Sequence, residues 1–272
     1  MAVHDVRSEW QEWGAAVRAH IRVVGALVRR EMRARGGESR LGYLWAVIEP
    51  LLHLLAYLLI FEYLLQRNSS LGGGMPLFML TGIVPYFLFS KMARYVSGAV
   101  VSNRSLLNLP PVKPIDVIVA RVVLEAATYL FVGFVMFVSL YLGGTADAIP
   151  YDPLAVMQAC ALAICLGLGV GMINIVIQSF FHNWMSIFGL LSFPLWFFSG
   201  IWFLPEQIPQ PYRDYMLYNP VMHAVMWFRT GFYRDFKAIF LDAPYAVGAG
   251  VVIVAVGLAL MRVARRKLLE PL

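Results

Sequence analysis

Residues 154–180 read LAVMQACALAICLGLGVGMINIVIQSF, a run of 27 residues without a single charged side chain. About 20 consecutive apolar residues are enough for a helix to cross the roughly 30 Å of hydrocarbon in a bilayer. The run lacks the alternation of a barrel strand and is too long to be one. Because backbone amides in lipid must pair within their own segment, the stretch predicts a transmembrane helix.

Five further apolar runs flank this one, and they predict an all-α membrane protein with six transmembrane helices. Over the whole chain 60% of residues are hydrophobic and only 14% are charged, whereas a soluble domain carries about a quarter charged residues. We therefore expect a cytoplasmic N-terminus over 1–40 and a transmembrane domain over 41–272. The five runs lie near 43–65, 77–98, 117–142, 185–204 and 245–262.

The basic residues predict the orientation of these spans. Seventeen of the 22 Lys and Arg residues lie in the first 40 residues, in 91–121 or in the C-terminal tail. Positive residues stay on the cytoplasmic side, so both termini are expected to be cytoplasmic in a bacterial inner membrane. A net charge of +6 can also indicate a nucleic-acid-binding protein. Here the charges stand beside apolar spans, and no aromatic-basic module is present, so we expect no nucleic-acid partner.

The stretch 15–35 predicts an amphipathic helix. Apolar residues recur at helical spacing from Val17 to Met32, and arginines form a second stripe beside them. This pattern favours a helix lying in the membrane surface, although a solvated helix docked on a partner protein would show it too. The arginine stripe consists of Arg18, Arg22, Arg29 and Arg33.

Residues 205–244 are too long for a hairpin and too apolar for a plain soluble loop, and prolines interrupt them repeatedly. We interpret them as short helices at the outer face. Aromatic residues are dense here, and they are typical both of an interfacial belt and of a surface that stacks on sugar rings. The aromatic residues taken as candidates for a substrate path are Trp196, Phe197, Trp202, Phe203, Tyr212, Tyr215, Trp227 and Tyr233.

Ionisable residues within the spans are the other candidates. Lys91 and Arg94 would attract an anionic substrate at an inner mouth or else reach for the headgroups. Glu49 stands four residues before His53, which would suit a proton site or a polar pair at the membrane edge. Arg121 and Glu125 have the same spacing and predict an ion pair.

Catalytic signatures are absent from the sequence. It contains no G-x-x-x-x-G-K-[ST] loop, no H-E-x-x-H and no G-x-S-x-G. We therefore expect no enzyme activity, no metal site and no cofactor bound by this chain. If ATP drives transport, another chain must bind it.

Three stretches resemble type-2 ABC exporter permeases. The first is LVRREMRARGGESRLGYLWAVIEPLLHLLAYLLIF at 27–61, where a basic helix leads into L-G-x-x-W-x-x-x-x-P-L. The second is SNRSLLNLPPVKPIDVIVAR at 102–121, and the third runs from FPLWFFSGIWFLPEQIP to YNP at 193–220. Together they extend the resemblance over nearly the whole chain. The positions that match the first motif are Leu41, Gly42, Trp45, Pro50 and Leu51.

This resemblance implies partners and a cargo. The chain is most similar to the capsular polysaccharide export permeases of Gram-negative bacteria. It would form a homodimer, dock on two copies of an ABC ATPase that bind ATP and Mg, and carry a lipid-linked polysaccharide. Periplasmic and outer-membrane polysaccharide export proteins would complete the system. The segment implied to couple to the ATPase consists of Arg104, Ser105, Leu106, Leu107, Asn108, Leu109 and Pro110.

Alternative functions remain open at this point. Permeases for O-antigen, teichoic acid or a drug share the same pattern. An ion-coupled secondary transporter would usually show an internal repeat, and a membrane-embedded transferase would need a clustered acidic or Cys/His site. Neither feature is evident in the sequence, and the Glu49–His53 pair is the best support for an ion-coupled transporter.

Overall fold

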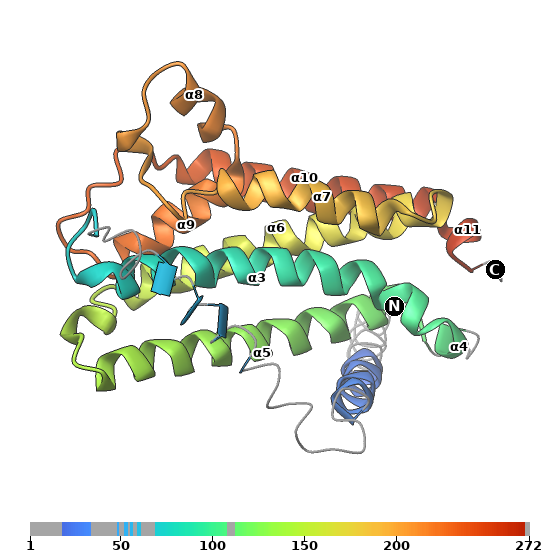
Figure 1. Ribbon diagram of the computed structural model, residues 1–272. Helices are drawn as coiled ribbons and strands as arrows, with labels where there is room; N and C mark the ends of the chain where they lie inside the picture. The colour runs from blue at the N-terminus through green and yellow to red at the C-terminus, as the bar shows by residue number, and fades with distance from the viewer. Residues whose placement is uncertain are drawn as a thin grey trace, which may run out of the picture.

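The computed structural model describes residues 18–33, 48, 52–53, 55–56, 59–60, 69–107 and 112–269. Four long helices run along one another and make up about half of the described chain (Figure 1). Each is long and apolar enough to cross a membrane. No β-strand occurs among the described residues. The four helices are α3 (Gly74–Ser102), α5 (Pro114–Leu142), α6 (Pro153–Phe180) and α10 (Ala243–Val263).

Small residues on α6 let its neighbours approach closely. A Cβ atom at Gly167 would lie 2.6 Å from the Cβ of Met92 on α3. A Cβ at Gly169 would lie 2.7 Å from a side-chain carbon of Ile253 on α10. Such close backbone approach is typical of helix pairs in membranes. The LGLGVG part of the run therefore places α6 between α3 and α10.

Side-chain caps set where several helices begin. The carboxylate of Asp152 accepts a hydrogen bond from the backbone of Ala155 at 3.1 Å, and α6 starts with Pro153. Asp242 caps α10 in the same way, at 2.9 Å from the backbone nitrogen of Tyr245. A capping oxygen followed by proline in the first turn satisfies amides that have no partner within the helix. The elements between the long helices are therefore joined at defined points.

Four of the six expected spans are present as long helices, namely α3, α5, α6 and α10. The expected span at 43–65 falls largely outside the described residues. The expected span at 185–204 is wrong in its extent, because α7 covers only Trp184–Phe197 and then turns through Gly200 at φ 73°. Fourteen residues rise only about 21 Å in a helix. The six-span prediction is thus unconfirmed.

The bundle has two different ends. One carries η2 (Ala146–Ala148), η3 (Pro205–Gln207), α8 (Tyr212–Leu217) and α9 (Pro220–Thr230), at the left of Figure 1. Short helices therefore do form within 205–244, as expected from the sequence. The opposite end carries α4 (Arg104–Leu107), α11 (Arg265–Leu269) and the helix at 18–33.

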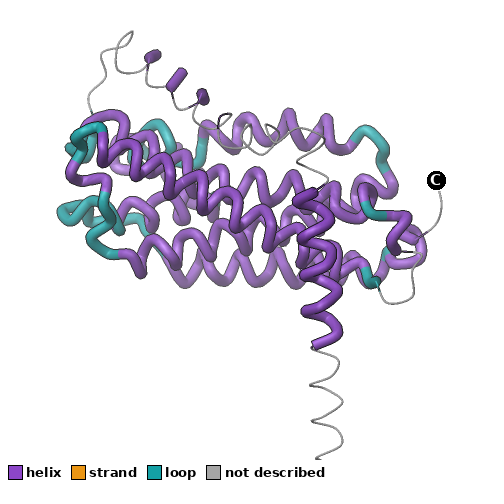
Figure 2. Tube along the Cα trace, turned by 90° about the horizontal axis from the view of Figure 1, so that it is seen from below, coloured by secondary structure: helices purple, strands orange, loops and turns teal. Residues whose placement is uncertain are grey.

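The helix at 18–33 runs across the bundle rather than along it (Figures 1 and 2). Leu27 is buried and joins a second hydrophobic cluster with residues of α3 and α5, and Val24 and Val28 pack against that cluster. Ile21 and Met32, expected on the same stripe, are exposed. Its place in the membrane surface stays a prediction.

Candidate functional site

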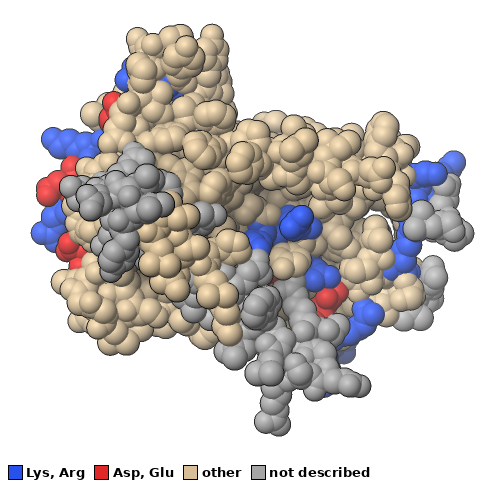
Figure 3. Space-filling model, viewed as in Figure 1, with Lys and Arg blue, Asp and Glu red and all other residues tan. Residues whose placement is uncertain are grey.

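The α4 end of the bundle gathers basic side chains, while the α8 end shows basic and acidic side chains together (Figure 3). Between the two ends the surface in this view is largely tan, but a few Lys and Arg side chains show near its middle. Candidate residues from the sequence analysis lie at both ends. Each end is therefore described from its own contacts.

A polar cluster at the α4 end joins three elements. Arg121 of α5 pairs with Glu31 of the crossing helix, with 3.0 Å between Nη2 and Oε2. The side-chain amide of Asn103, which is 1% exposed, donates to the other oxygen of Glu31 at 2.8 Å. Arg30 in turn donates to the amide oxygen of Asn103. Because Asn103 stands between α3 and α4, the cluster ties the crossing helix to the start of α4.

The expected pair of Arg121 and Glu125 is confirmed, at 3.8 Å between Nη1 and Oε1. Glu125 is fully buried, so the charge of Arg121 offsets part of the cost of removing a carboxylate from water. A second link at this end joins His20 to Asp116 at 2.7 Å. Sequence reasoning missed Glu31 and His20 as partners, because each lies some 90 residues before its partner in the chain.

Part of the expected coupling segment forms α4. Arg104, Ser105, Leu106 and Leu107 make one helical turn, while Asn108, Leu109 and Pro110 lie outside the described residues. Leu106 and Leu107 pack against the second hydrophobic cluster, whereas Ser105 is exposed. The turn is therefore anchored by its leucines, and Ser105 faces outward. The arginines of the expected stripe, Arg18, Arg22, Arg29 and Arg33, are all exposed.

Lys91 does not stand at the end of its helix. The helix continues to Ser102, which is about 16 Å further along its axis at 1.5 Å per residue. The Lys91 ammonium lies 5.7 Å from the ring centre of Phe87, and His53 meets the same ring edge-on at 6.3 Å. The structure thus brings two candidates together on Phe87. Arg94 is exposed, and Glu49 lies outside the described residues.

The eight candidate aromatic residues divide into two groups. Trp202 and Tyr233 are buried, at 4% and 7% exposed. Trp196, Phe203 and Trp227 are partly buried against the same core, and Trp196 meets Trp202 at 4.7 Å between ring centres. The exposed group consists of Phe197, Tyr212 and Tyr215.

Arg229 binds backbone carbonyls at the α8 end of the bundle. Its side chain is fully buried, and its guanidinium donates to the carbonyls of Gly200 at 2.6 Å and Ile201 at 2.9 Å. It also lies over the ring of Phe78, 4.1 Å from the centre. Burial lowers the pKa of Arg229 to about 10, so the group remains charged at neutral pH. These contacts hold the turn that ends α7, a role that the sequence did not reveal.

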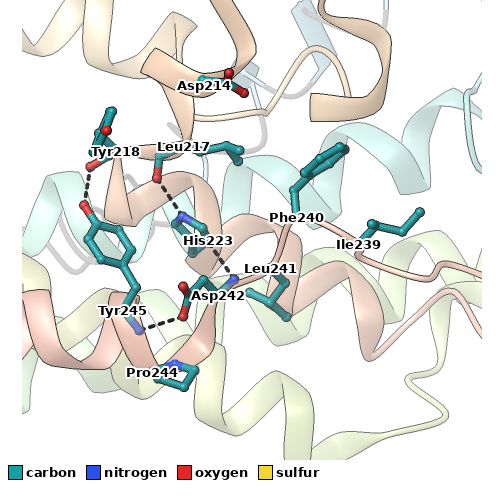
Figure 4. Close-up of a pocket in the computed structure, with 10 residues that line it drawn as sticks. All are labelled: Asp214, Leu217, Tyr218, His223, Ile239, Phe240, Leu241, Asp242, Pro244 and Tyr245. Carbon is teal, nitrogen blue, oxygen red and sulfur yellow. Dashed lines mark hydrogen bonds between the residues drawn. The ribbon is translucent and has the colours of Figure 1, made fainter. Parts of the chain in front are cut away.

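A cavity of about 580 Å³ lies between α8, α9 and the start of α10 (Figure 4). His223 forms part of its wall and joins these elements. Its Nε2–H donates to the carbonyl of Leu217 at 2.8 Å, and its Nδ1 accepts from the amide of Asp242 at 3.1 Å. Both ring nitrogens are used by a neutral imidazole, and burial lowers the pKa of His223. Tyr245 also donates to the carbonyl of Tyr218 at 2.7 Å.

Within the described part of the chain, no group of three or more His, Cys, Asp or Glu residues could hold a metal ion. Besides the carboxylates of Glu31, Asp116 and Glu125, the described clusters at the two ends contain basic side chains and aromatic rings. Such groups can bind and position an anionic or ring-shaped ligand. A family model described as ABC-2 type transporter matches residues 22–233.

This chain belongs to the ABC-2 type transporter family. The matched region of this ABC-2 transporter begins in the crossing helix and ends just after α9. It therefore includes the Glu31–Arg121 cluster, α4, Lys91 and Arg229. The matched region ends before Asp242 and Tyr245, which line the cavity beside His223.

Relatives of this ABC-2 transporter match it over nearly their whole length. Polysialic acid transport protein KpsM of Escherichia coli is 36% identical over 239 residues, which cover 88% of this chain and 92% of that protein. Capsule polysaccharide export inner-membrane protein CtrC of Neisseria meningitidis is 28% identical over 88% of this chain and 90% of its own. The corresponding protein BexB of Haemophilus influenzae is 27% identical, with 89% and 90% covered.

Proposed function

We propose that this chain is the permease subunit of an ATP-driven exporter that moves lipid-linked capsular polysaccharide across the bacterial inner membrane. The observation that carries the proposal is the match to KpsM at 36% identity over 88% of the chain. CtrC and BexB, both named for capsule polysaccharide export, match over similar lengths. Four apolar helices of spanning length fit a multi-pass membrane protein.

The energy source in this proposal is a separate ABC ATPase, present in two copies that bind ATP and Mg. It contacts a homodimer of this chain at the segment 104–110. Support comes from the absence of a P-loop in the sequence and from the way α4 is tied to the bundle. Movement of α4 would pull on Asn103, and through Glu31 and Arg121 it would reach both the crossing helix and α5. Rigid helices then carry the displacement across the membrane.

The path for the polysaccharide is proposed to run from the α4 end of the bundle to the α8 end. Six spans, cytoplasmic termini and outer short helices belong to the same proposal. Periplasmic and outer-membrane export proteins would receive the polymer beyond the α8 end. Lys91 and Arg94 are proposed to meet the anionic part of the lipid-linked substrate, because both are cationic and lie in the half of α3 that leads to α4.

Co-purification tests the assembly. The tagged chain, extracted in mild detergent, is expected to bring an ATPase of equal stoichiometry, and removal of residues 104–110 is expected to abolish that association. A preparation without an ATPase, under conditions that keep other ABC complexes intact, would contradict the proposal.

A deletion strain tests the cargo. Loss of the gene is expected to leave capsular polysaccharide inside the cell, and the intact gene restores export. Accumulation of O-antigen or teichoic acid intermediates instead would assign the chain to those substrates.

Charge reversal of Lys91 and Arg94 together is expected to reduce export at least tenfold with normal protein levels, since an anion would then meet like charge. Unchanged export would remove these two residues from the path.

A further inference from the structure

A cavity of about 260 Å³ lies at the α4 end of the bundle, and α4 itself forms part of its wall. Three elements form it, namely the end of α3 with α4, the end of α6 with the turn after it, and α11. Both α4 and α11 lie at the same end of the molecule (Figure 1). The cavity is smaller than the roughly 300–1,000 Å³ of sites for drug-sized ligands. It therefore suits a small group or one end of a larger molecule.

Basic side chains line the cavity. Arg104, His182 and Lys267 line the cavity, and each comes from a different element. The described lining residues include no carboxylate. The Nε of Arg104 is buried there and has no hydrogen-bond partner among the described residues. A buried donor without an acceptor is costly, and an anion in the cavity would offset the positive charge of the Arg104 guanidinium.

Two neutral polar residues of the wall, Gln178 and Ser179, make hydrogen bonds to the backbone of the bundle. The side-chain nitrogen of Gln178 donates to the carbonyl of Ser97, and the hydroxyl of Ser179 donates to the carbonyl of Val176. Both groups therefore act as donors to the backbone of the bundle. With these two donors already bound to backbone carbonyls, the basic side chains of the wall are the groups that favour an anion.

An apolar surface borders the basic groups. Val101 is 49% exposed and Phe180 is 61% exposed, and both line the same cavity. An inorganic anion would gain nothing from these side chains. A phospholipid would place its phosphate beside Arg104 and its glycerol and first acyl carbons against Val101 and Phe180. Basic pockets between helices at the cytoplasmic face are known to hold anionic lipid headgroups.

We propose that this cavity binds the phosphate diester of an anionic phospholipid and so braces α4 against α6 and α11. The site goes beyond the proposed transport function, because it would bind lipid whether or not a polysaccharide is being moved. Two sources share this chemistry, a lipid of the surrounding membrane and the phospholipid anchor of the exported glycan.

Native mass spectrometry of the intact complex tests the site. The complex is titrated with phosphatidylglycerol or phosphatidylcholine, and the lipid retained per chain is counted. Phosphatidylglycerol is expected to be retained, and the double variant Arg104→Gln, Lys267→Gln is expected to bind it about tenfold more weakly. The matched control is the double variant Arg265→Gln, Arg266→Gln. It also removes two charges, both from exposed residues of α11 that do not line the cavity.

The source is identified by competition. Displacement of phosphatidylglycerol by purified lipid-linked polysaccharide assigns the site to the glycan's anchor, while retention assigns it to membrane lipid, and either result supports the site. Equal lipid loss in the double variant and its control would overturn it. So would unchanged lipid retention with loss of the ATPase, which would assign the basic groups to an acidic side chain of that subunit. The lipid-binding measurement needs neither ATP nor transport. A negative result would therefore overturn the lipid site alone, and the export assay would still test the proposed function separately.

Discussion

The two ends of the bundle are held together by different chemistry. At the α4 end, charged side chains from the crossing helix, α3 and α5 meet each other, as Glu31 meets Arg121. At the α8 end, Arg229 and His223 bind backbone groups of neighbouring turns. Side-chain pairs can exchange partners when an element shifts, whereas contacts to backbone carbonyls fix the shape of a turn. The comparison suggests a movable end and a rigid end.

Loss of Arg229 is expected to have the largest effect on stability. The Arg229→Met substitution keeps the volume but leaves the carbonyls of Gly200 and Ile201 without their charged donor. Unsatisfied buried acceptors of this kind cost about 3 kcal/mol together. Thermal unfolding of the purified protein, followed by fluorescence, measures the loss.

The control for this prediction is Arg234→Met at the same end, where the arginine is exposed. Its expected effect is within about 0.5 kcal/mol. If both substitutions lower the unfolding temperature equally, burial and carbonyl contacts are not what makes Arg229 important, and the rigid end loses its main support.

The Glu31–Arg121 pair is the corresponding test at the other end. A double-mutant cycle with Glu31→Gln and Arg121→Met is expected to give a coupling energy of about 1–2 kcal/mol, because both side chains are largely buried. Each single change is also expected to lower export more than it lowers stability, since it unties the crossing helix from α5. Export and unfolding temperature are measured in the same variants.

Arg33→Gln serves as the matched control, because it removes an exposed charge from the same helix. Additive single effects on stability would show that the pair is not coupled. Export that falls only in proportion to protein level would restrict the pair to a structural role.

The sequence predicted the long helices well and their contacts poorly. A run such as 154–180 has no stable arrangement in lipid other than a helix, so α6 followed from composition and length. The Arg121–Glu125 pair followed from helical spacing. Glu31 and the carbonyls bound by Arg229 come from distant parts of the chain, and no local pattern links them. The apolar run at 185–204 continues past the end of α7 at Phe197, so composition extended that helix too far.

Acidification is expected to weaken the α8 end of the bundle. Burial lowers the pKa of His223, outweighing the opposing effects of Leu217 and Asp242. The folded state therefore binds this proton less readily than the unfolded state, whose histidine titrates near 6.5. Its contribution to stability is complete above about pH 6.5 and declines as the pH falls below that value.

Unfolding temperatures measured from pH 8 to pH 5 check this sign. His223→Gln can still donate to the Leu217 carbonyl and accept from the Asp242 amide, so it is expected to flatten the decline below pH 6.5. A variant with the same pH dependence as the original chain would show that other groups set the acid response.

The smallest effect on stability is expected at the exposed aromatic residues, and it separates the two roles that the sequence left open. Tyr215 is 70% exposed, so Tyr215→Ala should change the free energy of unfolding by less than about 0.5 kcal/mol. Trp202→Ala at the buried position should cost several times more. Export decides the role of Tyr215. A loss of export at unchanged stability would place it on the sugar path, because a belt residue contributes only anchoring at the interface. Unchanged export would assign it to the belt and leave the partly buried rings around Trp196 as the remaining stacking surface.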